Sequence, residues 1–367
     1  MKAKSRIRFV NKDKNQFFST LKARVDAYFV ENNLSKHANA TMIWKTVILL
    51  ACYFVPFVWL LVFQPVWPLS LLLWALMGFG VAGIGMSIMH DANHGAYSAN
   101  ELVNKWMGHT LNLAGGSVCN WKMQHNVLHH MFTNIVPLDE DIKDRAILKF
   151  SPHAAPKPIH KFQKFYAFVF YGILTLYWVV AKDFVQHFQF MQSGVNTDSK
   201  SENGWMLAKI IFDKILYFGV IIGLPIMLGI SAGQVILGFL LMHFIAGIVL
   251  TVVFQLAHTV EGTDHPIPQN GIIENDWAIH QLRTTVNFSR DNKLLSWYLG
   301  GLNFQVEHHL FPKICHVHYP NIAPIVKQTA EEFGLEYMEN PTFMSALASH
   351  IAALERFGTP SLNDAIG

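Results

Sequence analysis

The 367-residue chain contains 51% hydrophobic and only 14% charged residues, and its formal net charge at pH 7 is +3. The apolar residues gather in long runs, which is typical of an integral membrane protein and not of a soluble globular one. Basic residues beside the membrane explain the net charge, so nucleic-acid binding has no support. The three cysteines lie far apart without CxxC spacing, which argues against a disulfide framework and against a thiolate metal site.

Residues 1–41 form a polar, basic arm that we expect to lie in the cytoplasm. Ten Lys and Arg residues fall within residues 1–45, and cytoplasmic segments next to membrane spans are enriched in these residues. Four apolar residues of the arm recur at helical spacing, Phe17, Leu21, Val25 and Phe29. This spacing is compatible with a helix on the membrane surface and equally with an ordinary packed helix.

Two long stretches, residues 46–89 and 215–260, contain no Lys, Arg, Asp or Glu. Because a helix needs roughly 20 residues to cross a ~30 Å hydrocarbon core, each stretch fits a hairpin of two spans. The predicted spans are residues 43–64, 68–89, 208–230 and 234–257. Neither hairpin turn contains Lys or Arg, so both termini are predicted to be cytoplasmic.

A third apolar run, residues 165–181, is bracketed by Lys164 and Lys182. If this run crossed the membrane, residues 90–162 and the residues after Val260 would lie on opposite sides, which would separate two groups of histidines. The run is rich in Tyr and Trp, which favour membrane interfaces. We therefore predict that it is interfacial.

The predicted fold class is an all-α integral membrane protein. It has four transmembrane helices in two hairpins, interfacial helices, and a cytoplasmic helical cap that carries a metal site. Residues 42–340 are expected to form one integrated domain, because no Gly-Ser-rich or Pro-rich linker interrupts them. Amphipathic spacing predicts a cytoplasmic C-terminal helix within residues 341–367.

Histidines cluster in three short motifs. HDANH places two of them at i and i+4 on one helix face at the end of the second span, and QHNVLHH and QVEHH supply the others. The clustered residues are His90, His94, His125, His129, His130, His308 and His309. A further histidine, His258, lies at the end of the fourth span, so the four-span topology brings all of these residues to one side of the membrane.

This histidine pattern predicts a metal centre. Adjacent histidines diverge by about 100° on a helix, so the pairs His129–His130 and His308–His309 each suit two neighbouring metals better than one. Imidazole binds Zn, Cu, Fe and Ni alike, so the ligand type does not select the metal. Eight histidines are too many for one four-coordinate structural zinc, which favours a dinuclear redox centre.

The three motifs on this frame resemble those of the membrane fatty acid desaturases. The resemblance extends from about residue 40 to about residue 320 and includes GHTLNLAGGS, TNIVPLDEDI and LFPKICHVHYP. Gln305 opens the third motif, where many members have His. This feature is similar to the front-end subgroup (Δ6 or Δ5, linoleoyl-CoA desaturase-like), which inserts a double bond between an existing one and the carboxyl end.

The resemblance implies an O2-dependent enzyme with two non-haem iron ions that removes hydrogens from adjacent methylenes of an acyl-CoA or acyl-lipid and leaves a cis double bond. The implied iron ligands are His90, His94, His125, His129, His130, His258, His308 and His309. Further candidates as ligands or as hydrogen-bond partners of ligands are Gln305, His280, Asp91 and Glu307. The acidic cluster Asp139, Glu140 and Asp141 is compatible with accepting hydrogen bonds from the distal imidazole nitrogens and equally with a solvated loop. Lys122 and Arg145 are candidates for binding an anionic head group, or simply for anchoring beside the membrane.

Many front-end members carry a fused cytochrome b5 domain with an HPGG motif, and this sequence has no HPGG. The expected electron donor is therefore a separate cytochrome b5-type protein or a ferredoxin, and the expected location is a bacterial inner membrane. A hydroxylase, a ketolase or a sphingolipid-modifying relative remains an alternative with the same centre. A metal transporter would place ionisable ligands along a pathway within the spans, whereas only His243 lies at mid-span. The sequence does not determine regiochemistry, chain length, acyl carrier or oligomeric state.

Overall fold

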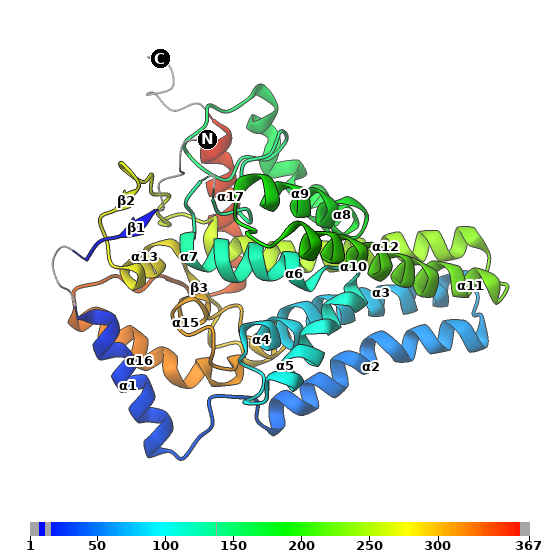
Figure 1. The fold of residues 1–367 in the computed structure, drawn as a ribbon, viewed down its shortest axis with the longest axis horizontal. Helices are drawn as coiled ribbons and strands as arrows, with labels where there is room; N and C mark the ends of the chain where they lie inside the picture. Colours follow the sequence, from blue (N-terminus) through cyan, green and yellow to red (C-terminus); the bar gives the residue numbers. More distant parts are fainter. Residues whose placement is uncertain (1–6, 12–15, 137, 360–367) are drawn as a thin grey trace. The chain divides into compact units, whose positions relative to one another are not determined.

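The computed structural model describes residues 7–11, 16–136 and 138–359, and these residues are mainly helical (Figure 1). Their contacts group into two compact units. The first unit comprises Met1–His37, Gln124–Ala167 and Val253–Gly367, and the second comprises Ala38–Met123 and Phe168–Val252.

The second unit begins with a helical hairpin of α2 (Ala40–Phe63) and a longer helix. The longer helix consists of α3 (Trp67–Gly83), the π-helical turn η1 (Ile84–Ile88) and α4 (Met89–His94). The Asn39 side chain accepts a hydrogen bond from the backbone N–H of Met42 and so caps α2. Gly95 ends α4 in the left-handed conformation, with φ of 78°. The hairpin, visible in Figure 1 as α2 beside α3, therefore ends at the HDANH motif.

The other helices of the second unit follow the hairpin. They are α5 (Glu101–Gly108), η2 (His109–Ala114), α6 (Val118–Trp121), η5 (Trp178–Lys182), α9 (Asp183–Ser193), α10 (Lys200–Phe218), η6 (Gly219–Gly223) and α11 (Leu224–Met227). Two longer helices, α8 (Gln163–Tyr177) and α12 (Ala232–His258), contribute residues to both units. They pack closely at two glycines, because a Cβ on Gly247 would lie 2.6 Å from the carbonyl oxygen of Gly172.

In the first unit, α1 (Phe17–Glu31) lies against α16 (Tyr319–Glu332), as Figure 1 shows. The four apolar residues of the arm are all buried in the core of this unit. Of the two interpretations of the arm, the structure therefore supports the packed helix over the helix on a membrane surface.

The remaining elements of the first unit are short. The helices are η3 (Lys122–His129, whose first two residues belong to the second unit), α7 (His130–Phe132), η4 (Pro158–Phe162), α13 (Trp277–Thr284), α14 (Lys293–Tyr298), α15 (Gln305–Leu310), η7 (His316–His318) and α17 (Phe343–Gly358). Two parallel pairs join β1 (Arg8–Phe9) to β2 (Ile272–Ile273) and β3 (Asn287–Phe288) to β4 (Glu339–Asn340). Helix α17 lies within the predicted C-terminal helix, of which residues 360–367 fall outside the described residues.

Within the described residues, five helical segments are long and apolar enough to cross a membrane: Ala40–Phe63, Trp67–His94, Pro158–Ser193, Lys200–Met227 and Ala232–His258. The prediction of an all-α membrane protein is confirmed, whereas the segments exceed the predicted number by one. The additional segment, Pro158–Ser193, contains the run 165–181 but is 36 residues long. The length of the uncharged run underestimated the length of this segment, because the helix continues through Lys164 and Lys182.

Candidate metal centre

Three buried histidines of the first unit converge from different helices. His129 ends η3, His258 ends α12, and His309 lies on α15. Each offers a ring nitrogen, and these nitrogens lie within 4.8 Å of one another. All three side chains are fully buried. Neutral imidazoles at this spacing suit a single metal ion.

The Nδ1 atom of each of these histidines faces a hydrogen-bond acceptor. The partners are Asp139 Oδ2 for His129 at 3.0 Å, the carbonyl oxygen of Thr284 for His258 at 3.2 Å, and Gln281 Oε1 for His309 at 2.8 Å. A carboxylate or carbonyl oxygen only accepts hydrogen bonds, so Nδ1 carries the proton and Nε2 keeps its lone pair.

The orientation of the Gln281 amide is fixed on both sides. Its Nε2 donates to the carbonyl oxygen of His130 at 3.3 Å, and its Oε1 also accepts from Thr133 Oγ1 at 2.9 Å. The amide oxygen therefore points at His309 and the amide nitrogen points away from it. This arrangement selects the tautomer of His309 in the way expected for a metal ligand.

The described residues provide no hydrogen-bond partner for Nε2 of His129, His258 or His309. A buried polar atom without a partner costs about 1–3 kcal/mol, and here three such atoms point to one place. A metal ion would satisfy all three lone pairs. The donor set therefore fits a transition-metal ion of the kind that imidazole binds.

A second group in the same unit shares His309. The nitrogens of His130, His308 and His309 also lie within 4.8 Å of one another, and Nε2 of His130 lies 3.3 Å from Nε2 of His125. The rings of the adjacent pairs are nearly perpendicular, at 81° for His129–His130 and 84° for His308–His309. Each pair therefore divides between the two groups, with His309 common to both.

Charge around the cluster affects its histidines in opposite directions. Burial alone would lower the pKa of His129, but the adjacent Asp139 carboxylate outweighs burial and raises it. Burial and the neighbouring His130 lower the pKa of His309 well below its usual value. His309 is thus neutral at pH 7 and available as a ligand without losing a proton.

In the second unit, His90 and His94 lie one turn apart on α4, with ring centroids 4.8 Å apart. Both rings contact the edge or face of Trp121, at centroid distances of 5.8 and 5.7 Å. Asp91 is also buried, and its Oδ1 lies 4.0 Å from His90 Nδ1. The i, i+4 arrangement predicted from the motif is present.

The acidic cluster supports the histidines directly. Besides its contact with His129, Asp139 accepts hydrogen bonds from the backbone N–H groups of Asn134 and Asp141. Oδ2 of Asp141 lies 3.6 Å from His125 Nδ1, and Asp141 also accepts a hydrogen bond from the Gln124 amide. The turn after α7 therefore brings Asp139 and Asp141 to two of the predicted ligands.

Two of the further candidates have other partners. His280 Nε2 lies 2.8 Å from the carbonyl oxygen of Thr133, and burial lowers the pKa of His280 to about 4. Glu307 is buried and accepts hydrogen bonds from Tyr337 Oη and Asn287 Nδ2, each at 2.8 Å. Burial raises the pKa of the Glu307 carboxyl to about 7. Both residues thus support the loops that surround the cluster.

Gln305 is buried, and no described residue offers a hydrogen-bond partner to its Oε1. The two basic candidates lie outside the cluster. Lys122 is exposed, and Arg145 is half-exposed, with its guanidinium 3.7 Å from the Glu140 carboxylate.

Nothing in the sequence pattern singled out Gln281, Thr284 or Thr133. The available signal was the stretch HQLRTT, in which only His280 attracted attention. On a helix, Gln281 and Thr284 share one face because they are three residues apart, and that face of α13 carries the acceptors for His309 and His258.

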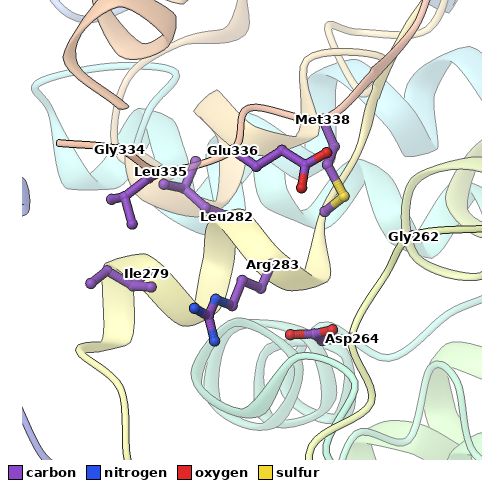
Figure 2. A pocket seen from close by; sticks show the side chains of 9 residues that line it. All are labelled: Gly262, Asp264, Ile279, Leu282, Arg283, Gly334, Leu335, Glu336 and Met338. Carbon is purple, nitrogen blue, oxygen red and sulfur yellow. The ribbon is translucent and has the colours of Figure 1, made fainter. Parts of the chain in front are cut away.

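The opposite face of α13 lines a pocket. At 100° per residue, Ile279, Leu282 and Arg283 point away from Gln281. They form a pocket of about 260 Å³ together with Gly262, Asp264, Gly334, Leu335, Glu336 and Met338 (Figure 2). Its lining includes charges of both signs and no histidine, so it is separate from the ligand cluster.

Comparison with known protein families matches residues 65–341 to the family described as fatty acid desaturase. The chain belongs to the fatty acid desaturase family. The match confirms the resemblance seen in the histidine motifs, and this desaturase is an oxidoreductase that introduces a double bond into an acyl chain. All eight predicted histidine ligands lie within the matched region.

Individual relatives place the desaturase in the front-end subgroup. It is 37% identical over 360 residues to the sn-1 linoleoyl-lipid 6-desaturase of Synechocystis sp., a match that covers 97% of this chain and 99% of the relative. It is 38% identical to the relative of the same name from Arthrospira platensis, covering 93% and 92%. An acyl-lipid (8-3)-desaturase of Physcomitrium patens is 35% identical, covering 97% of this chain and 74% of the relative.

Proposed function

We propose that this desaturase is an acyl-lipid desaturase with two non-haem iron ions, which inserts a cis double bond on the carboxyl side of an existing one. The observation that carries the proposal is the convergence of three buried Nε2 atoms, each on a histidine whose Nδ1 faces an acceptor. The names of the relatives from Synechocystis sp. and Arthrospira platensis support a lipid-linked linoleoyl chain and the 6 position.

The residues divide between two metals as follows. His129, His258 and His309 hold one iron, while His125, His130 and His308, with His309, surround the position of the second. His90 and His94 remain ligands predicted from the sequence motif. When bound, the irons supply reduction of O2 coupled to removal of two hydrogens from neighbouring methylenes, with electrons from an external cytochrome b5-type protein or ferredoxin.

The protein contributes orientation and exclusion of water. Asp139, Gln281 and the Thr284 carbonyl hold three imidazoles in the tautomer that presents Nε2 to the metal. Because the proposed ligands are buried, the chain would keep bulk water away from a bound metal, which limits side reactions. Lys122 and Arg145 are proposed to attract the anionic head group of the substrate.

We further propose that four of the five candidate segments cross the membrane. His130 precedes three of these segments and His309 follows them, yet both lie in one group of the first unit. An even number of crossings must therefore separate them, which supports placing Pro158–Ser193 at the interface. With basic residues concentrated in the arm, both termini and the metal centre lie on the cytoplasmic side, in a bacterial inner membrane.

A cysteine introduced at the exposed Thr197, in a variant whose three native cysteines are replaced by serine, tests this topology, since a four-span chain places the α9–α10 loop on the cytoplasmic side. We expect a membrane-impermeant maleimide to label it only in inverted vesicles. Labelling in intact cells or right-side-out vesicles would mean that Pro158–Ser193 crosses the membrane.

The reaction itself is tested in host cells that express the desaturase and receive mono- and polyunsaturated fatty acids. We expect gas chromatography and mass spectrometry to show a new double bond on the carboxyl side of an existing one. The His308→Ala variant should be expressed in the membrane without forming this product. A hydroxylated or ketonic product instead would assign the protein to the oxygenases that use the same type of centre.

A further inference from the structure

The second unit contains a buried ion pair that the proposed chemistry does not use. Asp183 begins α9 and is fully buried, and Lys214 on α10 is 6% exposed. Their Oδ2 and Nζ atoms lie 2.7 Å apart. Both residues belong to segments apolar enough to cross a membrane. Removing two charges from water is costly, and such a pair persists only where further hydrogen bonds satisfy both groups.

Those hydrogen bonds converge on one segment of backbone, residues 115–120. Lys214 Nζ donates to the carbonyl oxygen of Gly115 at 2.5 Å and to that of Trp178 at 3.1 Å. With Asp183 as its third acceptor, the ammonium group uses all three of its N–H donors. The lysine therefore connects α10 to the start of this segment.

Asp183 binds the rest of the segment. Its Oδ2 accepts a hydrogen bond from the backbone N–H of Ser117 at 3.0 Å, and its carbonyl oxygen accepts one from Asn120 Nδ2 at 2.7 Å. Its Oδ1 accepts from Trp178 Nε1 at 3.0 Å. Together the two charged residues hold the segment at its beginning, its middle and its end.

The segment needs this support because its backbone is irregular. Gly115 has φ of +74°, and a Cβ at this position would lie 2.3 Å from Val179 Cγ2, so only glycine fits. Irregular backbone inside a membrane protein is tolerated only where the protein itself satisfies the free N–H and C=O groups.

The residue that follows the segment is Trp121. Its indole meets both His90 and His94 nearly at right angles, with interplanar angles of 77° and 74°. The same indole packs with Met89 and Val118 in a small buried cluster. Any shift of residues 115–120 would therefore move the aromatic surface against which both imidazoles rest.

We propose that Asp183 and Lys214 are positioning residues for His90 and His94, acting through residues 115–120 and Trp121. The inference rests on the proposed function, in which these two histidines bind iron. The pair fixes the backbone that places the indole, and the indole restricts the rotamers of the two imidazoles. The ion pair therefore keeps residues 115–120 rigid beside α4, which presents both imidazoles to a metal from one helix face.

The test measures Co(II) binding to the metal-free, full-length protein in detergent, by the visible absorption of the bound ion. We expect Lys214→Met to weaken Co(II) binding about tenfold, the lower end of the range seen when groups that orient ligands are removed, and to change the spectrum. Trp121→Ala should produce the same change. In the double variant Lys214→Met with Trp121→Ala, Co(II) binding and its spectrum should be the same as in Trp121→Ala alone, because both substitutions act at the same point.

Two variants separate positioning from folding. The double variant Asp183→Asn with Lys214→Gln keeps donors and acceptors without buried charge, and we expect its Co(II) affinity to return to within about twofold of the wild type. Lys209→Gln breaks a more exposed ion pair on the same helix, whose atoms lie 2.6 Å apart, and should change neither affinity nor spectrum.

The outcomes distinguish this inference from the function on which it rests. If His90→Ala leaves the Co(II) spectrum unchanged, the ligand assignment fails and the positioning role fails with it. If His90→Ala changes the spectrum while folded Lys214→Met and Trp121→Ala do not, only the positioning role is overturned. If Lys214→Met does not fold, the decision passes to Trp121→Ala and to the double variant.

Discussion

A His309→Ala variant is expected to form no detectable product and to lose at least half of its bound iron. His309 lies in both histidine groups of the first unit, but its Nδ1 donates to Gln281, so its single free nitrogen binds one iron and its removal takes a ligand from that iron. Losing a residue that only orients a ligand already costs 10–100-fold in metal affinity, and losing a ligand itself should cost roughly a hundredfold or more. The measurements are iron per protein by mass spectrometry and fatty acid products by gas chromatography.

His309→Asn is the matched variant for this test. The asparagine amide can still donate to Gln281, as His309 Nδ1 does at 2.8 Å, but it provides no Nε2 lone pair. We expect the wild-type thermal stability of the metal-free protein together with the same loss of iron and product. His153→Ala removes an exposed histidine and serves as the neutral control. Normal iron content in folded His309→Asn would refute the assignment of His309 as an iron ligand.

An Asp139→Asn variant is expected to bind metal 10–100-fold more weakly while remaining folded. The carboxylate fixes the ring of His129 through Nδ1 and also accepts two backbone N–H groups of its own turn. Asparagine retains one acceptor for the turn but removes the negative charge beside His129. The measurement is Co(II) or Fe(II) affinity of the metal-free protein, with Glu140→Gln as the control from the same turn.

The same variant should alter the pH dependence of metal binding. Asp139 raises the pKa of His129 above its usual value, so protons compete with the metal, and wild-type affinity should fall as the pH drops through that raised pKa. Without the carboxylate, burial dominates and the pKa of His129 falls. Affinity should then depend less on pH between 6 and 8, although it is lower throughout. An unchanged pH slope would contradict the role of Asp139.

Most of the histidines that converge in the structure could be predicted from the sequence, because they fall in three short motifs whose spacing reflects one helix turn. Asp139 was found as a partner for similar reasons, since it follows QHNVLHH closely along the chain. Gln281 was missed although it orients His309. Nothing local distinguishes this glutamine from any other, and its contact with Thr133 joins residues 148 positions apart.

The number of membrane spans shows what hydropathy alone does not predict. Hydropathy located every candidate segment but classified residues 165–181 by the length of the uncharged run. The helix that contains this run extends from Pro158 to Ser193, because backbone hydrogen bonding continues past a lysine that can extend its charge toward water. The ends of a helix are set by its caps and contacts, which hydropathy does not record.

The sequence by itself determined the membrane class, the family and the identity of the clustered histidines, because each depends on composition or on spacing within one segment. Only the tertiary structure decided which rings share a site, that His309 belongs to both groups, and that Gln281 and the Thr284 carbonyl orient two of the ligands. It also revealed Asp183 and Lys214 as partners. The physical reason is that hydropathy is a property of neighbours along the chain, whereas a hydrogen bond depends on which distant segments the fold brings within 3 Å.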